Sequence, residues 1–115
     1  MPRPYSVLSF KIDEVRNVRE RPAEFHEDQD DVFRVIKGEM RFILGGEPVG
    51  PVDTKDGLTW TSRAIAEGKE FIVRGGYEVR IPAGNWHQWT APDWAIYTVE
   101  KVPAIEGRVK PEAGK

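Results

Sequence analysis

Apolar and polar residues alternate along most of this 115-residue chain, in short runs separated by Gly, Pro and Asp. A period of two places every second side chain on the same face, which is typical of β-strands. The runs predict eight or nine short strands, as in a sandwich or barrel. The expected strands are Tyr5–Phe10, Phe25–His26, Val32–Ile36, Glu39–Leu44, Leu58–Ala66, Glu70–Val73, Tyr77–Ile81, Trp86–Thr90 and Trp94–Val99.

The composition supports an all-β protein of one domain. Val and Ile together occur 20 times and Leu only three times, and Gly and Pro add another 20 punctuating positions. Such β-branched, Leu-poor chains favour a sheet over a helical bundle. We expect a domain over 1–102 and a flexible C-terminal tail over 103–115, a mobile terminus or a strap across a neighbouring subunit.

Two segments depart from the strand pattern. Asp13–Val18 is the one stretch that suits a helical turn, because Asp13 is a capping residue and Val15 and Val18 would share a helical face. The segment Gly45–Gly57 is long for a bare hairpin loop, so it is either a surface elaboration or a lid over a pocket.

Charge and cysteine content exclude several classes of protein. Seventeen basic and 19 acidic residues give a net charge of −2 without a basic block, so we expect no nucleic-acid partner. No signal-like or 18-residue apolar stretch is present, and the expectation is a soluble cytoplasmic protein without a membrane partner. The absence of Cys excludes disulfides, Cys-ligated metals and thiol catalysis, and two histidines cannot form a three-histidine metal site.

Both histidines lie in segments that carry other polar groups at suggestive spacings. Glu24 and His26 are two residues apart on an expected strand and therefore share a face, and Asp31 opens the next strand after a polar turn. In the second segment a strand runs into Pro82-Ala83-Gly84, a tight-turn sequence that determines where His87 points. From the first segment, the carboxylate of Glu24, the imidazole of His26 and the carboxylate of Asp31 are thus expected to converge inside a barrel.

The second of these segments resembles the second motif of the cupin superfamily, Gly-x5-Pro-x-Gly-x2-His-x3-Asn. The chain matches it at Gly76, Pro82, Gly84 and His87, with Ala91 in place of the final Asn. This match is highly specific.

The first segment resembles the first cupin motif, Gly-x5-His-x-His-x(3 or 4)-Glu-x6-Gly, in a degenerate form. Here the motif positions are occupied by Val18, Glu24, His26, Asp31 and Gly38. The resemblance covers roughly residues 18 to 100. It implies a small jelly-roll β-barrel of the RmlC type, commonly a homodimer, with a divalent metal near the wider end of the barrel.

Carried over position by position, the resemblance implies Glu24, His26, Asp31 and His87 as metal ligands. This mixed set suits Fe, Mn, Zn or Ni with positions left open for substrate. Two alternatives remain for the carboxylates: Asp31 reaches the metal directly or through water, and Glu24 is a ligand or a general base. Either carboxylate is a candidate catalytic residue. Some cupins lack a metal, in which case the histidines are hydrogen-bonded interior residues.

Alternation also suggests the pocket walls. Trp89 shares a face with His87, and Phe33 and Met40 are further inward candidates, whereas Trp86 points away and serves core or dimer packing. Such a pocket would fit a small aromatic or other apolar ligand. Five arginines could bind a substrate carboxylate if they faced inward; alternation places Arg34 and Arg80 outside and leaves the others undecided: Arg34, Arg41, Arg63, Arg74 and Arg80.

Two functional hypotheses follow. The leading one is a metal-dependent cupin enzyme, either an oxygenase or a lyase, isomerase or cyclase, acting on a small aromatic or enolisable molecule with Glu24 or Asp31 moving protons. The other is a non-catalytic cupin that binds a small molecule as a sensor or carrier. Fold alone does not choose between them, because one fold hosts many activities.

Overall fold

The computed structural model describes residues 7–54 and 56–104, and in this part of the chain the regular structure is all β-strand. None of the described residues forms a helix that could span a membrane. The strands are β1 (Ser9–Val18), β2 (Ala23–His26), β3 (Gln29–Leu44), β4 (Glu47–Val49), β5 (Asp53–Thr54), β6 (Thr59–Ser62), β7 (Ala64–Ala66), β8 (Lys69–Arg74), β9 (Glu78–Ile81) and β10 (His87–Pro103).

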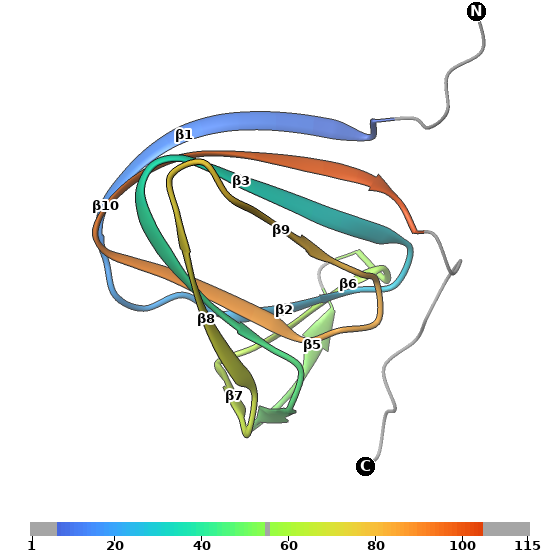
Figure 1. Cartoon of the computed structure of the whole chain (residues 1–115). Helices are drawn as coiled ribbons and strands as arrows, with labels where there is room; N and C mark the ends of the chain where they lie inside the picture. Colours follow the sequence, from blue (N-terminus) through green and yellow to red (C-terminus); the bar gives the residue numbers. More distant parts are fainter. Residues whose placement is uncertain (1–6, 55, 105–115) are drawn as a thin grey trace, which may run out of the picture.

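Two long antiparallel strands, β3 and β10, form the frame of the molecule. They pair along nearly their whole length, from Gln29 opposite Pro103 to Leu44 opposite His87. The register shifts between Thr90 and Ala95, where both strands bend and turn from one layer into the other (Figure 1). Each long strand therefore contributes to two layers of a closed β-structure.

The remaining strands extend these two layers. One layer contains β1, the second half of β10, the first half of β3 and β9. The other has the order β5, β6, β2, the first half of β10, the second half of β3, and β8. A separate two-stranded ribbon is made by β4 and β7. The layers face each other across the main core (Figure 1).

The main core consists of the inward residues of both long strands. Phe33, Val35, Met40 and Phe42 of β3 pack with Tyr97 and other residues of β10, and all are almost completely buried. Burying aromatic and β-branched side chains from two facing layers is the principal source of stability in such a fold. A second, smaller cluster contains Ala23, Phe25 and Trp86.

The expected helical turn at Asp13–Val18 is wrong: these residues belong to β1. Pairing with β10 slips between Arg16 and Val18, and Asn17 has a φ of 55°. Between the flanking pairs β1 has one residue, Asn17, and β10 has two, so the extra residue of this β-bulge is on β10. The left-handed φ of Asn17 turns β1 so that Val15 and Val18, three apart, both pack against the main core. The spacing that suggested a helical face is the signature of the bulge.

In two cases, a pair of expected strands forms one continuous strand in the structure. Val32–Ile36 and Glu39–Leu44 are both parts of β3, which runs through Gly38. Gly38 has a φ of +79°, and a Cβ there would collide with the carbonyl oxygen of Trp94. The glycine allows β3 to bend against β10 rather than to end in a turn. Trp94–Val99 similarly continues β10.

The long segment Gly45–Gly57 is an elaboration of the sheet within its described residues. It contains β4, which pairs with β7, and β5, which pairs with β6. At the other end, β10 extends to Pro103, one residue past the expected domain boundary, and the N–H of Ala104 donates to the carbonyl of Asp28. The rest of the expected tail, 105–115, lies outside the described residues, as do Tyr5 and Ser6 of the first expected strand.

Candidate metal centre and adjoining cavity

Glu24, His26 and His87 converge at the junction of β2 and β10. Glu24 lies opposite His87 in the β2–β10 register, and His26 follows two residues later on β2. One carboxylate oxygen of Glu24 and one ring nitrogen of each histidine all lie within 4.8 Å of one another. The residues placed together by motif spacing are therefore together in space.

The hydrogen bonds of the two rings direct their Nε2 atoms inward. His87 Nδ1 lies 3.1 Å from the carbonyl oxygen of Asn85, and His26 Nδ1 lies 3.1 Å from Thr59 Oγ1. A carbonyl oxygen only accepts, so Nδ1 of His87 carries a proton, and Nε2 faces the cluster, where it is a donor to Asp31 when the ring is protonated and a lone pair for a metal when the ring is neutral. Metal-ligating histidines have this second contact as a rule.

Asp31, at the start of β3, completes the group. Its Oδ2 lies 3.2 Å from His26 Nε2 and 3.5 Å from His87 Nε2, while Oδ1 accepts from Lys101 Nζ at 3.0 Å. Burial by itself raises the pKa of Asp31, but the two imidazoles and the charge of Lys101 outweigh it and hold the pKa well below its usual range. Asp31 is consequently an ionised carboxylate at neutral pH.

Hydrogen bonds connect the turn that precedes His87 to the first motif. Asp30 Oδ1 accepts from the backbone N–H of Ala83 at 2.7 Å, and Asp30 Oδ2 is paired with Arg80. The N–H of Gly84 donates to the carbonyl of His26 at 2.9 Å. These bonds fix the position of the two motifs, more than 50 residues apart, relative to each other. Asp30 was not among the site residues expected from the sequence.

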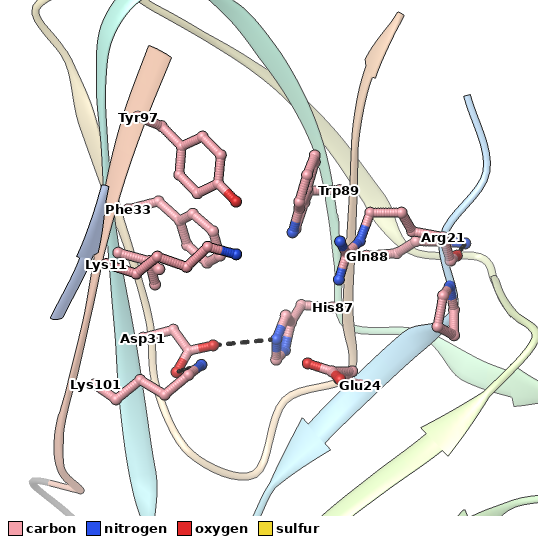
Figure 2. A pocket seen from close by; sticks show the side chains of 12 residues that line it. Lys11, Arg21, Glu24, Asp31, Phe33, His87, Gln88, Trp89, Tyr97 and Lys101 are labelled. Carbon is pink, nitrogen blue, oxygen red and sulfur yellow. Dashed lines mark hydrogen bonds and ion pairs between the residues drawn. The ribbon is translucent and has the colours of Figure 1, made fainter. Parts of the chain in front are cut away.

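A cavity of about 180 Å³ opens beside the cluster (Figure 2). Phe33, Trp89, Tyr97 and Val99 form its apolar wall, and Glu24, Asp31 and His87 line its polar end. Burial raises the pKa of Tyr97, so its hydroxyl remains a hydrogen-bond donor at neutral pH. The expected wall residues Phe33 and Trp89 thus face the cavity.

Met40 does not line this cavity, contrary to the expectation. It follows the bend at Gly38 and is completely buried in the main core. Alternation placed Met40 on the inward side of the strand, as observed, but the bend directs that side toward packed core rather than toward open space.

Three cations that the sequence did not single out border the cavity: Lys11, Arg21 and Lys101. The five arginines considered from alternation all lie elsewhere. Arg34 forms an exposed pair with Glu78, Arg80 pairs with Asp30, and Arg41, Arg63 and Arg74 have exposed side chains. Arg21 precedes β2 in a connection without regular structure, where alternation makes no prediction.

The other tryptophans have structural surroundings. Trp86 packs against Phe25 with ring centroids 5.4 Å apart. Of the two roles expected for Trp86, core packing and dimer packing, the structure shows core packing. Trp60 Nε1 donates to the buried carboxylate of Glu27, and Trp94 Nε1 donates to Glu14 at 2.6 Å on the surface.

No family model matches the chain, and no curated protein matches it in sequence. Solved structures do match. A hydroquinone 1,2-dioxygenase from Sphingomonas sp. TTNP3, with 4-hydroxybenzoate bound, is 13% identical with a TM-score of 0.57, over 89% of this chain and 67% of that one. The hydroquinone 1,2-dioxygenase PnpCD, with Cd²⁺ and 4-hydroxybenzonitrile, is 18% identical with a TM-score of 0.56, over 95% and 75%.

A third match is dTDP-4-dehydrorhamnose 3,5-epimerase from Bacillus anthracis str. Ames, with TDP and pyrophosphate bound. It is 14% identical with a TM-score of 0.56, and the match covers 87% of this chain but only 54% of the epimerase. The two layers and these matches define a small all-β barrel protein. More particularly, the chain has the cupin jelly-roll fold, which confirms the fold implied by the two motifs.

The residues present fit a divalent metal. His26 Nε2 is buried and makes no hydrogen bond of suitable geometry, although two carboxylates approach it. A buried polar atom without a hydrogen bond is uncommon in proteins and points to an unfilled partner. Two imidazoles and one or two carboxylates form a donor set that divalent first-row metals accept.

Proposed function

We propose that this protein is a metal-dependent cupin enzyme that acts on a small organic molecule in the cavity beside Glu24, His26 and His87. The observation that carries the proposal is the convergence of these three residues, whose ligand atoms all lie within 4.8 Å of one another, next to an open cavity. Asp31 Oδ2, 3.2 Å from His26 Nε2, adds a further oxygen to this group.

Under this proposal His26, His87 and Glu24 hold the metal, and Asp31 is a fourth ligand or a base that moves protons. A divalent metal bound here supplies a Lewis acid that polarises a substrate oxygen, or a centre that activates dioxygen. Asp31 is ionised, but the imidazoles and Lys101 that lower its pKa also weaken it as a base, so it can accept a proton only from an acidic substrate group. Lys101 can stabilise the charge that results. Phe33, Trp89 and Tyr97 enclose the substrate and exclude water.

The reaction class proposed is either an oxygenation or a proton-transfer reaction of the lyase, isomerase or cyclase type. The cavity is smaller than the roughly 300–1,000 Å³ of pockets for drug-sized ligands, which favours a compact substrate. Two proteins of the same fold bind 4-hydroxybenzoate and 4-hydroxybenzonitrile, which makes small aromatic compounds the first to test. Fe, Mn, Zn and Ni are the metals to test.

The decisive measurement is the metal content of protein purified without added metal, and again after chelation and incubation with Fe, Mn, Zn or Ni. We expect about one metal ion per chain in the wild type and a loss of affinity of 100-fold or more in His26→Ala and His87→Ala, since each removes a ligand. Glu20→Gln, on an exposed side chain near β2, is the matched control and should bind metal normally.

Oxygen consumption then separates the two reaction classes. An Fe-loaded protein that consumes oxygen with a small aromatic substrate is an oxygenase, whereas substrate conversion without oxygen uptake indicates proton chemistry. Wild-type protein that takes up none of the four metals would contradict the proposed function and favour a non-catalytic small-molecule binder, a sensor or carrier.

We also propose a cytoplasmic homodimer. Leu8, directly before β1, and Phe10 and Ile12 on β1 alternate along the chain and are more than half exposed. Within the described residues β1 pairs only with β10. An exposed row of apolar side chains beside an open strand edge is an unfavourable surface for a monomer. Light scattering on purified wild-type protein and on Phe10→Glu tests the proposal: a dimer that Phe10→Glu dissociates supports it, and a wild-type monomer contradicts it.

A further inference from the structure

The wall of the cavity opposite Asp31 carries a cation whose side chain is held in place. The guanidinium carbon of Arg21 lies 4.2 Å from the centroid of the Trp89 ring, and Gln88 Nε2 donates to the backbone carbonyl of Arg21 at 2.5 Å. Figure 2 shows Arg21, Gln88 and Trp89 on one side of the cavity, with Lys11, Asp31 and Lys101 on the other. The stacking and the backbone bond fix where the guanidinium lies.

Arg21 has a donor that nothing in the described chain satisfies. Its Nε is buried and makes no hydrogen bond, and within residues 7–54 and 56–104 the side chain forms no ion pair. Leaving a buried charged donor unpaired is costly, so such a group calls for a partner, which a ligand, an ion or a water molecule can supply. The Nε edge of a guanidinium offers two parallel N–H donors, which match the two oxygens of a carboxylate.

The other cations of the cavity already have partners. Lys101 Nζ lies 3.0 Å from Asp31 Oδ1, and Lys11 Nζ lies 3.5 Å from Asp13 Oδ2 at the exposed rim. Among the described residues, Arg21 is therefore the cavity cation for which no ion pair with a carboxylate is seen. Glu24 and Asp31 line the same space and repel multiply charged anions more than singly charged ones.

We propose that the cavity binds a small monocarboxylate, with Arg21 receiving the carboxylate. The apolar side chains of Phe33, Trp89 and Val99 line the same cavity and would contact the body of the molecule. This inference rests on the proposed function for the role of the bound molecule as substrate. Recognition of the carboxylate depends on Arg21 and not on a metal.

The test uses chelator-treated, metal-free protein and sodium benzoate as the probe. Benzamide, at matched ionic strength, is the neutral compound of the same shape, and inorganic phosphate is the alternative anion. The readout is the NMR signal of the Trp89 indole N–H in ¹⁵N-tryptophan-labelled protein, assigned with Trp89→Phe. We expect a saturable shift with benzoate, and binding of benzamide and phosphate that is weaker by about tenfold or more.

Variants identify the receiving residue. Arg21→Met should weaken benzoate binding by about tenfold or more and leave benzamide nearly unchanged, because only the carboxylate uses the guanidinium. Arg21→Lys, which retains the charge and the long stem, should recover part of the loss. Arg19→Met is the matched control: Arg19 is exposed, two residues away, and donates to Asn17. It should bind benzoate like the wild type.

Equal binding of benzoate and benzamide, tighter binding of phosphate than of benzoate, or no response to Arg21→Met would overturn the inference. These outcomes are separate from those for the proposed function. If the protein takes up no metal but binds benzoate through Arg21, the carboxylate site is supported and the proposed enzyme function is contradicted. If it takes up metal but does not bind benzoate in this way, the enzyme function is supported and the carboxylate site is contradicted.

Discussion

Asp30 Oδ1 accepts a hydrogen bond from the backbone N–H of Ala83, 53 residues away in sequence, at 2.7 Å. Ala83 is in the turn that leads to His87, whereas Asp30 comes directly before Asp31 on β3. Because neighbouring residues of a strand point to opposite sides, the two adjacent aspartates have different tasks. Asp31 faces the two imidazoles, and Asp30 secures the turn that places one of them.

We predict that Asp30→Ala destabilises the fold and weakens metal binding, although Asp30 contacts neither histidine ring. The change leaves the buried N–H of Ala83 without an acceptor and removes the partner of Arg80. The free energy of unfolding should fall by about 2–3 kcal/mol. Urea denaturation followed by tryptophan fluorescence measures this loss, and metal titration measures the accompanying drop in affinity.

The control for this prediction is Asp93→Ala, an exposed aspartate within β10. Its free energy of unfolding should stay within about 0.5 kcal/mol of the wild type. Equal stability of Asp30→Ala and Asp93→Ala would show that the turn is held by other contacts.

Thr59 supports the cluster through His26. Its Oγ1 lies 3.1 Å from His26 Nδ1, and the two residues are opposite each other in the β2–β6 register. Thr59→Val keeps the shape of the side chain and removes the hydrogen-bond partner, so the ring loses its fixed orientation. We expect metal affinity to fall about tenfold, as for other residues that orient metal-binding histidines.

Calorimetric titration with Zn²⁺ checks the effect of Thr59→Val. Thr98→Val, in the second half of β10 opposite Ile12 and Arg34, is the matched control and should leave the affinity unchanged. A wild-type affinity in Thr59→Val would mean that backbone packing alone orients His26.

The two carboxylates of the cluster should differ when each is replaced by its amide. Glu24 belongs to the compact group with both histidines, whereas Asp31 is shared between the imidazoles and Lys101. We therefore expect Glu24→Gln to weaken Zn²⁺ binding at least tenfold, and Asp31→Asn to weaken it less while abolishing substrate conversion. Metal titration and turnover on the same preparations separate the two effects. The reverse order would make Asp31 the principal carboxylate ligand.

The sequence predicted much of the cluster because its geometry is local. Glu24 and His26 are two residues apart on one strand, and a Pro-Ala-Gly turn precedes His87, so strand periodicity and turn chemistry place them. Arg21 was missed because it lies in an irregular connection, and Asp30 because its partner is a backbone N–H that only the folded chain brings near. Long-range contacts of this kind leave no periodic signal.

The strand boundaries show the same limit. A glycine within an alternating run reads as a turn, yet Gly38 continues β3, because the close approach of Trp94 requires a residue without a Cβ. Likewise the irregular pairing at Asn17, whose φ is 55°, changes which side chains of β1 face the core and imitates a helical spacing. Both features depend on the partner strand, and the partner is unknown when one segment is considered alone.

Gly38 and Gly76, the glycines of the two motifs, provide a matched pair for a last prediction. Both have positive φ, +79° and +94°, so an alanine is strained at either position. At Gly76 a Cβ meets open space, and Gly76→Ala should cost only about 1 kcal/mol of the free energy of unfolding. At Gly38 the same Cβ would collide with the Trp94 carbonyl oxygen and force β3 away from β10.

Gly38→Ala should therefore cost about 3 kcal/mol or more, a large part of the roughly 5–15 kcal/mol that stabilises a typical domain. Urea denaturation of the two variants side by side measures the difference, and the common strain of positive φ cancels between them. The excess at Gly38 is then the cost of separating the two strands that frame the barrel. Similar losses at the two positions would show that the bend at Gly38 can relax without breaking the β3–β10 pairing.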